Sequence, residues 1–139
     1  MKTEYLRFQV YNQTGVAFGG LAGDYIDMQC KLLNLTTSSG VLAEQTLASP
    51  EVFSIATATL ANNAVLNSTS FDASNGGVQA IYQGEVTWQV GITNTATGTV
   101  SLLVQSSQDN TTWPSVGVGQ VISAITFSAA GSENAQGEF

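Results

Sequence analysis

The chain has 139 residues, of which 43% are hydrophobic and only 9% are charged, and its formal net charge is −7. This length and apolar content predict one folded domain and argue against intrinsic disorder. The three basic residues, Lys2, Arg7 and Lys31, are too few to neutralise a phosphate backbone or an anionic lipid surface, so nucleic acid and membrane are excluded as partners.

The predicted elements are strands, because apolar and polar residues alternate along most of the chain. In order, alternating stretches occupy residues 5–11, 25–35, 85–93, 99–105 and 116–128. The glycine-rich segment 15–23 is predicted as a flexible loop. In residues 25–35, Cys30 lies in the apolar phase, so we expect its thiol to be buried.

Residues 41–66 are ambiguous between two structures. Ser49, Pro50 and Glu51 resemble the start of a helix, with an N-cap, a proline in the first position and an acid in the first turn. The following residues, 52–60, are rich in β-branched side chains and alternate, which favours a strand. We prefer the strand and keep a short helix as the alternative.

Residues 85–104 give the strongest pattern in the chain. Val86, Trp88 and Val90 alternate with polar residues, a turn follows at 93–98, and the alternation then resumes. This predicts an antiparallel hairpin with one buried and one polar face, and it places Trp88 in the core.

The predicted fold class is therefore all-β. Short strands separated by turn signals favour an antiparallel β-sandwich, most simply a single jelly roll of seven or eight strands. We expect residues 1–128 to form the domain and residues 129–139 to form a polar C-terminal tail. The loop at 15–23 and this tail would be natural arms toward a neighbouring molecule.

Residue types that support catalysis are scarce. Histidine is absent and Cys30 is the single cysteine, which excludes nucleophile–histidine arrangements, imidazole metal sites and an intrachain disulfide. Asp24 and Asp27 have opposite parity on a strand, and no loop containing Asp72 or Asp109 spaces its acids as a calcium site does. We expect no enzyme activity, no cofactor and no bound metal.

A polar turn carries the candidate contact residues, which are Asp109, Asn110, Thr112 and Trp113. In one interpretation Trp113 anchors the turn by packing back over the sandwich. In the other, its ring is a stacking platform for a sugar, with the neighbouring polar side chains as hydrogen-bonding partners.

Around this turn the chain resembles bacteriophage virion proteins, in which a β-sandwich carries a Q-x-S-x-D-x-x-x-W turn after a W-x-V strand. The matching residues here are Trp88, Val90, Gln105, Ser107, Asp109 and Trp113. The resemblance covers roughly residues 81–117, about a quarter of the chain. Similar strand-turn-Trp patterns occur in carbohydrate-binding modules.

The resemblance implies a capsid, decoration, spike or tail component that forms homo-oligomers, docks onto other virion proteins and has no catalytic residues. The start of the chain lacks the apolar stretch of a signal peptide, so we expect synthesis in the host cytoplasm and residence in the virion. The alternatives are a carbohydrate- or receptor-binding module that contacts a host-surface glycan, and a subunit of a prokaryotic surface filament.

Overall fold

The computed structural model describes residues 5–36, 41–47, 59–72 and 79–139, with side chains described for 5–31, 59–70 and 84–139. Nine strands and no helix occur in this part of the chain. The strands are β1 (Tyr5–Gln13), β2 (Tyr25–Thr36), β3 (Val41–Leu47), β4 (Val65–Asn67), β5 (Phe71–Asp72), β6 (Gln79–Ile92), β7 (Thr99–Ser107), β8 (Gln120–Thr126) and β9 (Gly131–Glu138).

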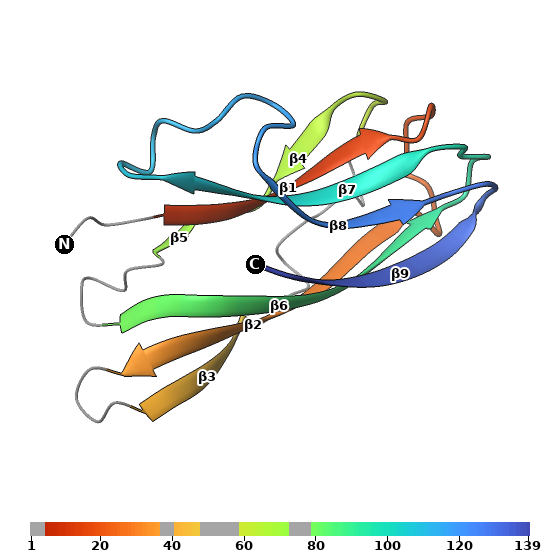
Figure 1. The fold of residues 1–139 in the computed structure, drawn as a ribbon. Coiled ribbons are helices and arrows are strands. Elements are labelled where there is room, and N and C mark those ends of the chain that lie inside the picture. The colour runs from red at the N-terminus through yellow and green to blue at the C-terminus, as the bar shows by residue number, and fades with distance from the viewer. Residues whose placement is uncertain (1–4, 37–40, 48–58, 73–78) are drawn as a thin grey trace.

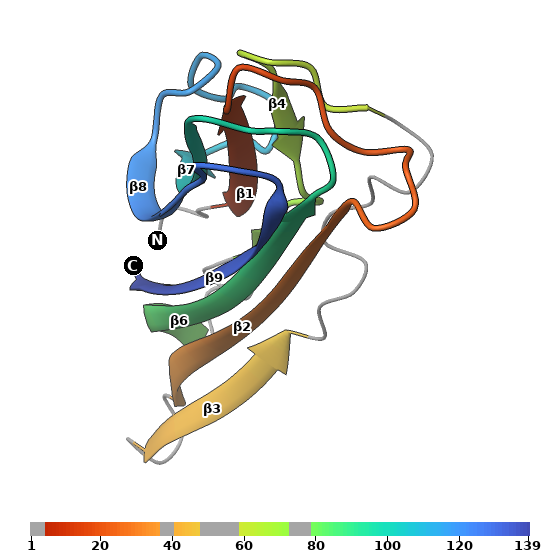
Figure 2. The same cartoon turned by 90° about the vertical axis from the view of Figure 1, so that its right-hand side faces the viewer.

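The strands form two antiparallel sheets packed face to face (Figures 1 and 2). One sheet has five strands in the order β4-β1-β7-β8, with β5 also paired to β1, and the other has four in the order β3-β2-β6-β9. The all-β sandwich is thus confirmed, whereas the strand order does not confirm a jelly roll. The strand number exceeds the predicted seven or eight because β4 and β5 are pieces of three and two residues.

The core lies between the sheets, and the period-two alternation of the strands fills it. Phe8 and Val10 enter it from β1, and Trp88 enters it from β6 with only 1% of its surface exposed. The Trp88 indole N–H donates to the Ser123 hydroxyl at 3.0 Å, which satisfies the one polar atom of the ring. The placements of Trp88 and of the buried Cys30 are both confirmed.

The predicted hairpin at 85–104 is wrong. β6 pairs with β2 and β9, while β7 pairs with β1 and β8 in the opposite sheet. Residues 93–98 therefore carry the chain from one sheet to the other (Figure 2). Both strands still bury one alternating set of side chains in the shared core, so their alternation is the same in a crossover as in a hairpin.

The predicted polar tail is also corrected, because residues 131–138 form strand β9 at the edge of the four-stranded sheet. Two of its inward positions that meet the core are small: Ala135 packs on the core, and a Cβ at Gly137 would lie 2.4 Å from the Ile122 carbonyl oxygen of β8. Beyond the strand, the Phe139 ring packs edge-on against Phe8 with centroids 5.5 Å apart. The segment packs beside β8 and closes the sandwich, so it does not extend as an arm toward a neighbouring molecule.

The glycine-rich loop 15–23 is confirmed as a loop, but it too is held against the body. Phe18 is buried and pairs through its backbone with Leu60. The buried carboxylate of Asp24 accepts hydrogen bonds from the Gly19 N–H at 2.7 Å and from the Thr93 N–H and hydroxyl at 2.7 and 2.8 Å. Asp24 thus joins two loops at one end of the sandwich.

The ambiguous region is settled in part. Residues 41–47 and 65–67 are strands, whereas the segment 48–58, which contains the proposed helix start, lies outside the described residues.

Candidate functional site

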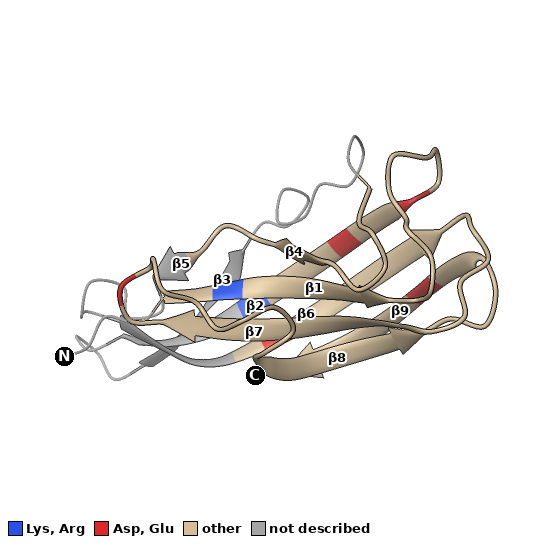
Figure 3. Cartoon of the chain, turned by 90° about the horizontal axis from the view of Figure 1, so that it is seen from above, with Lys and Arg blue, Asp and Glu red and all other residues tan. Residues whose placement is uncertain are grey.

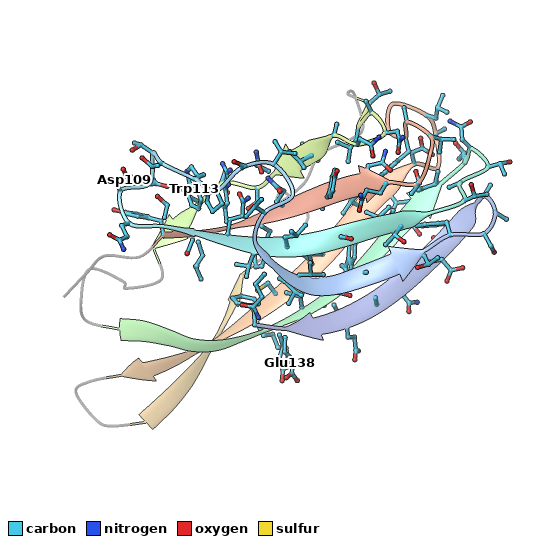
Figure 4. The ribbon with its side chains drawn as sticks, turned by 45° about the horizontal axis from the view of Figure 1, so that its top comes forward. Asp109, Trp113 and Glu138 are labelled. Atoms are coloured by element: carbon cyan, nitrogen blue, oxygen red, sulfur yellow. The ribbon has the colours of Figure 1, made fainter. Side chains whose placement is uncertain are left out.

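The loop between β7 and β8 lies over the outer face of the five-stranded sheet (Figures 1 and 4). We call residues 108–119 the clamp loop. Beneath it, Gln9, Leu103 and Gln105 point away from the inter-sheet core, yet each is only 1% exposed. Their burial on the outer face of a sheet indicates that the clamp loop forms a third layer.

Gln105 attaches the clamp loop to β7. Its side-chain amide N–H groups donate to the carbonyl oxygens of Val118 at 2.6 Å, Ser115 at 3.2 Å and Pro114 at 3.4 Å. Its amide oxygen accepts from the Arg7 Nε at 2.9 Å. A single buried side chain therefore provides hydrogen bonds to several backbone carbonyls of a loop that is not paired with a β-strand.

Gln9 attaches the same loop to β1. Its amide oxygen accepts from the Gly117 N–H at 2.9 Å, and its amide nitrogen donates to the Asn67 side chain at 2.8 Å. Gly117 has φ of +71°, and a Cβ there would lie 3.1 Å from the Tyr11 ring. The positive φ favours glycine, and any larger residue would also push the Tyr11 ring aside by a few tenths of an ångström.

The tip of the clamp loop is organised by Asp109. Its carboxylate accepts from the Thr111 N–H at 2.9 Å, from the Thr112 N–H at 2.7 Å, from the Thr112 hydroxyl at 2.8 Å and from the Ser107 hydroxyl at 3.0 Å. These bonds stabilise the ionised form and lower the pKa of the Asp109 carboxyl well below its usual value. Asn110 takes a positive φ of 59°, which a short polar residue tolerates in such a turn.

Trp113 packs back onto the sheet. The Arg7 guanidinium lies over its ring, with the carbon atom 4.3 Å from the ring centroid, which is cation–π geometry. Partial burial lowers the pKa of Arg7, but the group remains a cation at neutral pH. This arrangement favours the turn-anchor interpretation of Trp113, because one face of its ring is already covered.

The structure brings the four predicted contact residues together in one loop, and it gives three of them internal partners. Asp109 and Thr112 bond each other and the loop backbone, and Trp113 stacks with Arg7. Gln105, Ser107, Asp109 and Trp113 of the resembling motif are thus the residues that build the clamp loop. Gln9 was not predicted as part of the site, because a glutamine on a strand's polar face carries no signal that a loop will cover it.

No known protein family, curated protein or solved structure matches the chain.

The clamp loop presents apolar side chains to solvent. Val116 is 61% exposed and Val118 is 55% exposed, and Val121 at the start of β8 is 58% exposed. We call these three residues the valine patch. The other large hydrophobic residue that is exposed in the described chain, Leu21, lies in the glycine-rich loop. Isolated valines in a turn and at a strand start gave no signal for this patch in the sequence.

Groups for other chemistry are dispersed. Among the residues that the structure describes, no three His, Cys, Asp or Glu side chains come together as metal ligands. Burial raises the pKa of the Cys30 thiol to about 12, so this thiol is a poor nucleophile. The described chain also contains no helix with the length and apolar character needed to cross a membrane.

Proposed function

We propose that the protein is a non-enzymatic virion structural component that associates with copies of itself and docks onto other virion proteins through the valine patch. The class of particle rests on the resemblance around Gln105, Ser107, Asp109 and Trp113. The observation that carries the mode of action is two exposed valines on a loop anchored by two buried glutamines, with a third exposed valine at the start of the following strand.

A docking surface gains from being ordered before it binds. Gln9 and Gln105 fix the backbone of the clamp loop, so the loop backbone loses little conformational freedom on association. Each exposed valine contributes about 1.5 kcal/mol when it leaves water. Several apolar contacts of this size, on a rigid loop and at the start of the strand that follows it, form the centre of a protein interface.

The surroundings of the patch fit a protein partner. Charged residues are few over the described chain (Figure 3), and they make up only 9% of the sequence. Interface cores are depleted of charge, since an ion is costly to desolvate, whereas hydroxyl and amide groups are less costly to bury. Repeated burial of such surface between identical subunits is the basis of a closed symmetric assembly.

The test compares two variants of matched chemistry. Val116→Thr with Val118→Thr keeps the β-branched shape but makes the patch polar, and Leu21→Thr makes a distant exposed position polar. We expect sedimentation velocity to show assembly for the wild type and for Leu21→Thr, and a shift to monomer for the double variant. Equal assembly of all three proteins, with unchanged thermal unfolding, would remove the patch from the proposal.

A further inference from the structure

The outer face of the four-stranded sheet contains a groove that the valine patch and the clamp loop do not use. Figure 4 shows Asp109 and Trp113 on one side of the sandwich and Glu138 of β9 on the other. The groove has a volume of about 680 Å³. Its polar lining comes from β2, β6 and β9 and consists of Asp27, Gln29, Thr87, Gln89, Asn134 and Gln136.

The strand register arranges this lining in two rows that cross three strands. Gln29, Thr87 and Gln136 are direct partners in one row. Asp27, Gln89 and Asn134 are direct partners in the next. These side chains point outward because the residues that alternate with them, such as Met28 and Trp88, are buried. Each row therefore gives a short ladder of hydrogen-bonding groups at about the 4.8 Å spacing of neighbouring strands.

An aromatic ring closes one end of the rows. Tyr25, Gly91 and Ser132 form the adjoining cross-strand set. A Cβ at Gly91 would lie 2.3 Å from the Tyr25 ring, so the ring lies across β6 at that glycine. The Tyr25 hydroxyl is hydrogen-bonded to the Ser132 hydroxyl on β9, and the Gln89 amide also donates to Ser132 at 3.3 Å. The ring is thus fixed beside the amides.

The chemistry of the lining selects a ligand. Four amides offer both donors and acceptors, Thr87 offers a hydroxyl, and Asp27 supplies one negative charge without a cation in the lining. This composition disfavours phosphates, sulfates and other anions. The backbone of β6 is already paired on both sides, so an extended peptide would find no strand edge there.

We propose that this groove binds a neutral oligosaccharide. Sugar hydroxyl groups both donate and accept, which matches the amide rows, and the Asp27 carboxylate accepts from hydroxyl pairs. The apolar face of a sugar ring packs on an aromatic ring such as that of Tyr25. The glycan interpretation of the sequence is thereby moved from the Trp113 turn to the opposite face of the sandwich. This inference does not depend on the valine patch.

The experiment titrates the isotope-labelled full chain with short neutral oligosaccharides built on glucose, galactose, mannose or N-acetylglucosamine. The side-chain NH₂ signals of Gln29, Gln89, Asn134 and Gln136 report the groove directly in NMR spectra. A sulfated oligosaccharide serves as the anionic probe. We expect at least one neutral sugar to shift these signals in a saturable way, and the sulfated probe to leave them unchanged.

Matched variants place the site. Gln29→Ala with Gln136→Ala should weaken sugar binding about thirtyfold, the loss expected for two neutral hydrogen bonds of about 1 kcal/mol each. Asn110→Gly removes a predicted contact at the clamp-loop tip while tolerating its positive φ, and it should leave affinity unchanged. Binding that is equal in the double variant, shifts that map to Trp113, or no saturable binding by any neutral sugar would each overturn the proposal.

Discussion

Replacing Gln105 by alanine should detach the clamp loop without unfolding the sandwich. The side chain is 1% exposed, its two amide N–H groups are shared among three loop carbonyls, and its amide oxygen accepts from Gln9 at 3.5 Å and from Arg7 at 2.9 Å. A neutral bond contributes about 1 kcal/mol and one to a charged group about 2 kcal/mol. With two donated bonds, one bond from Gln9 and one from the Arg7 cation, the simple sum is about 5 kcal/mol.

The measured loss should be smaller than this sum. Because the loop lies on the surface, it can lift and let water reach the carbonyls and the Arg7 guanidinium, so these groups are not left buried and unpaired. We expect Gln105→Ala to lower the free energy of unfolding by about 3 kcal/mol in urea denaturation. The exposed neighbour Gln108 is the control, and Gln108→Ala should stay within about 0.5 kcal/mol of the wild type.

Hydrogen exchange distinguishes detachment from general destabilisation. In Gln105→Ala the Gly117 and Val118 amides, which donate to Gln9 and to the Ser115 carbonyl, should lose protection, while amides in β6 keep theirs relative to global unfolding. A stability within about 0.5 kcal/mol of the wild type, with unchanged protection in the loop, would refute the role assigned to Gln105.

Three further predictions follow from single positions. Burial tends to raise the pKa of Asp24, but hydrogen bonds from Gly19 and Thr93 outweigh it and lower the pKa. Asp24→Asn should therefore lower the free energy of unfolding by about 2 kcal/mol at pH 7. In urea denaturation, the stability difference between wild type and variant should be present above the unfolded pKa of about 4 and should be lost as the pH falls through the folded pKa. A difference that persists unchanged at low pH would contradict this role of the carboxylate. A Cβ at Gly98 would lie 2.2 Å from the Gln13 carbonyl oxygen, so Gly98→Ala should destabilise the protein by about 2 kcal/mol and lower its thermal midpoint. A Cβ at Gly131 would have nothing within 4 Å, so Gly131→Ala should leave the midpoint unchanged. Equal midpoints for the two variants would contradict the close approach at Gly98. Cys30, with its thiol pKa raised to about 12 by burial, should react with a thiol reagent only in urea, and rapid labelling of the native protein would contradict its burial.

The sequence predicts the strands well because their alternation is local. Phe8, Trp88 and Val90 alternate with polar neighbours, and the structure buries all three. Which sheet a strand joins is a different matter. The crossover at 93–98 is as short as a hairpin loop, and both connections bury the same face, so no local pattern separates them.

The remaining differences come from contacts distant in sequence. β9 is polar because its outward face meets solvent and it contributes no large apolar side chain to the core, as Gly137 beside Ile122 shows, and in sequence such a strand resembles a tail. Gln105 and Gln9 are 96 positions apart in the sequence, and the clamp loop that buries them is held in place by hydrogen bonds to both. The predicted residues Asp109 and Trp113 do lie in that loop, but the groove lined by Gln29, Thr87 and Gln136 depends on the pairing register of three strands.

The native mass of the purified protein over a wide concentration range tests self-association through the valine patch most directly. Light scattering should show a mass that rises with concentration to a fixed multiple of the 14.5 kDa chain. The double variant Val116→Thr, Val118→Thr should show no such rise. A monomer at every concentration would contradict the account.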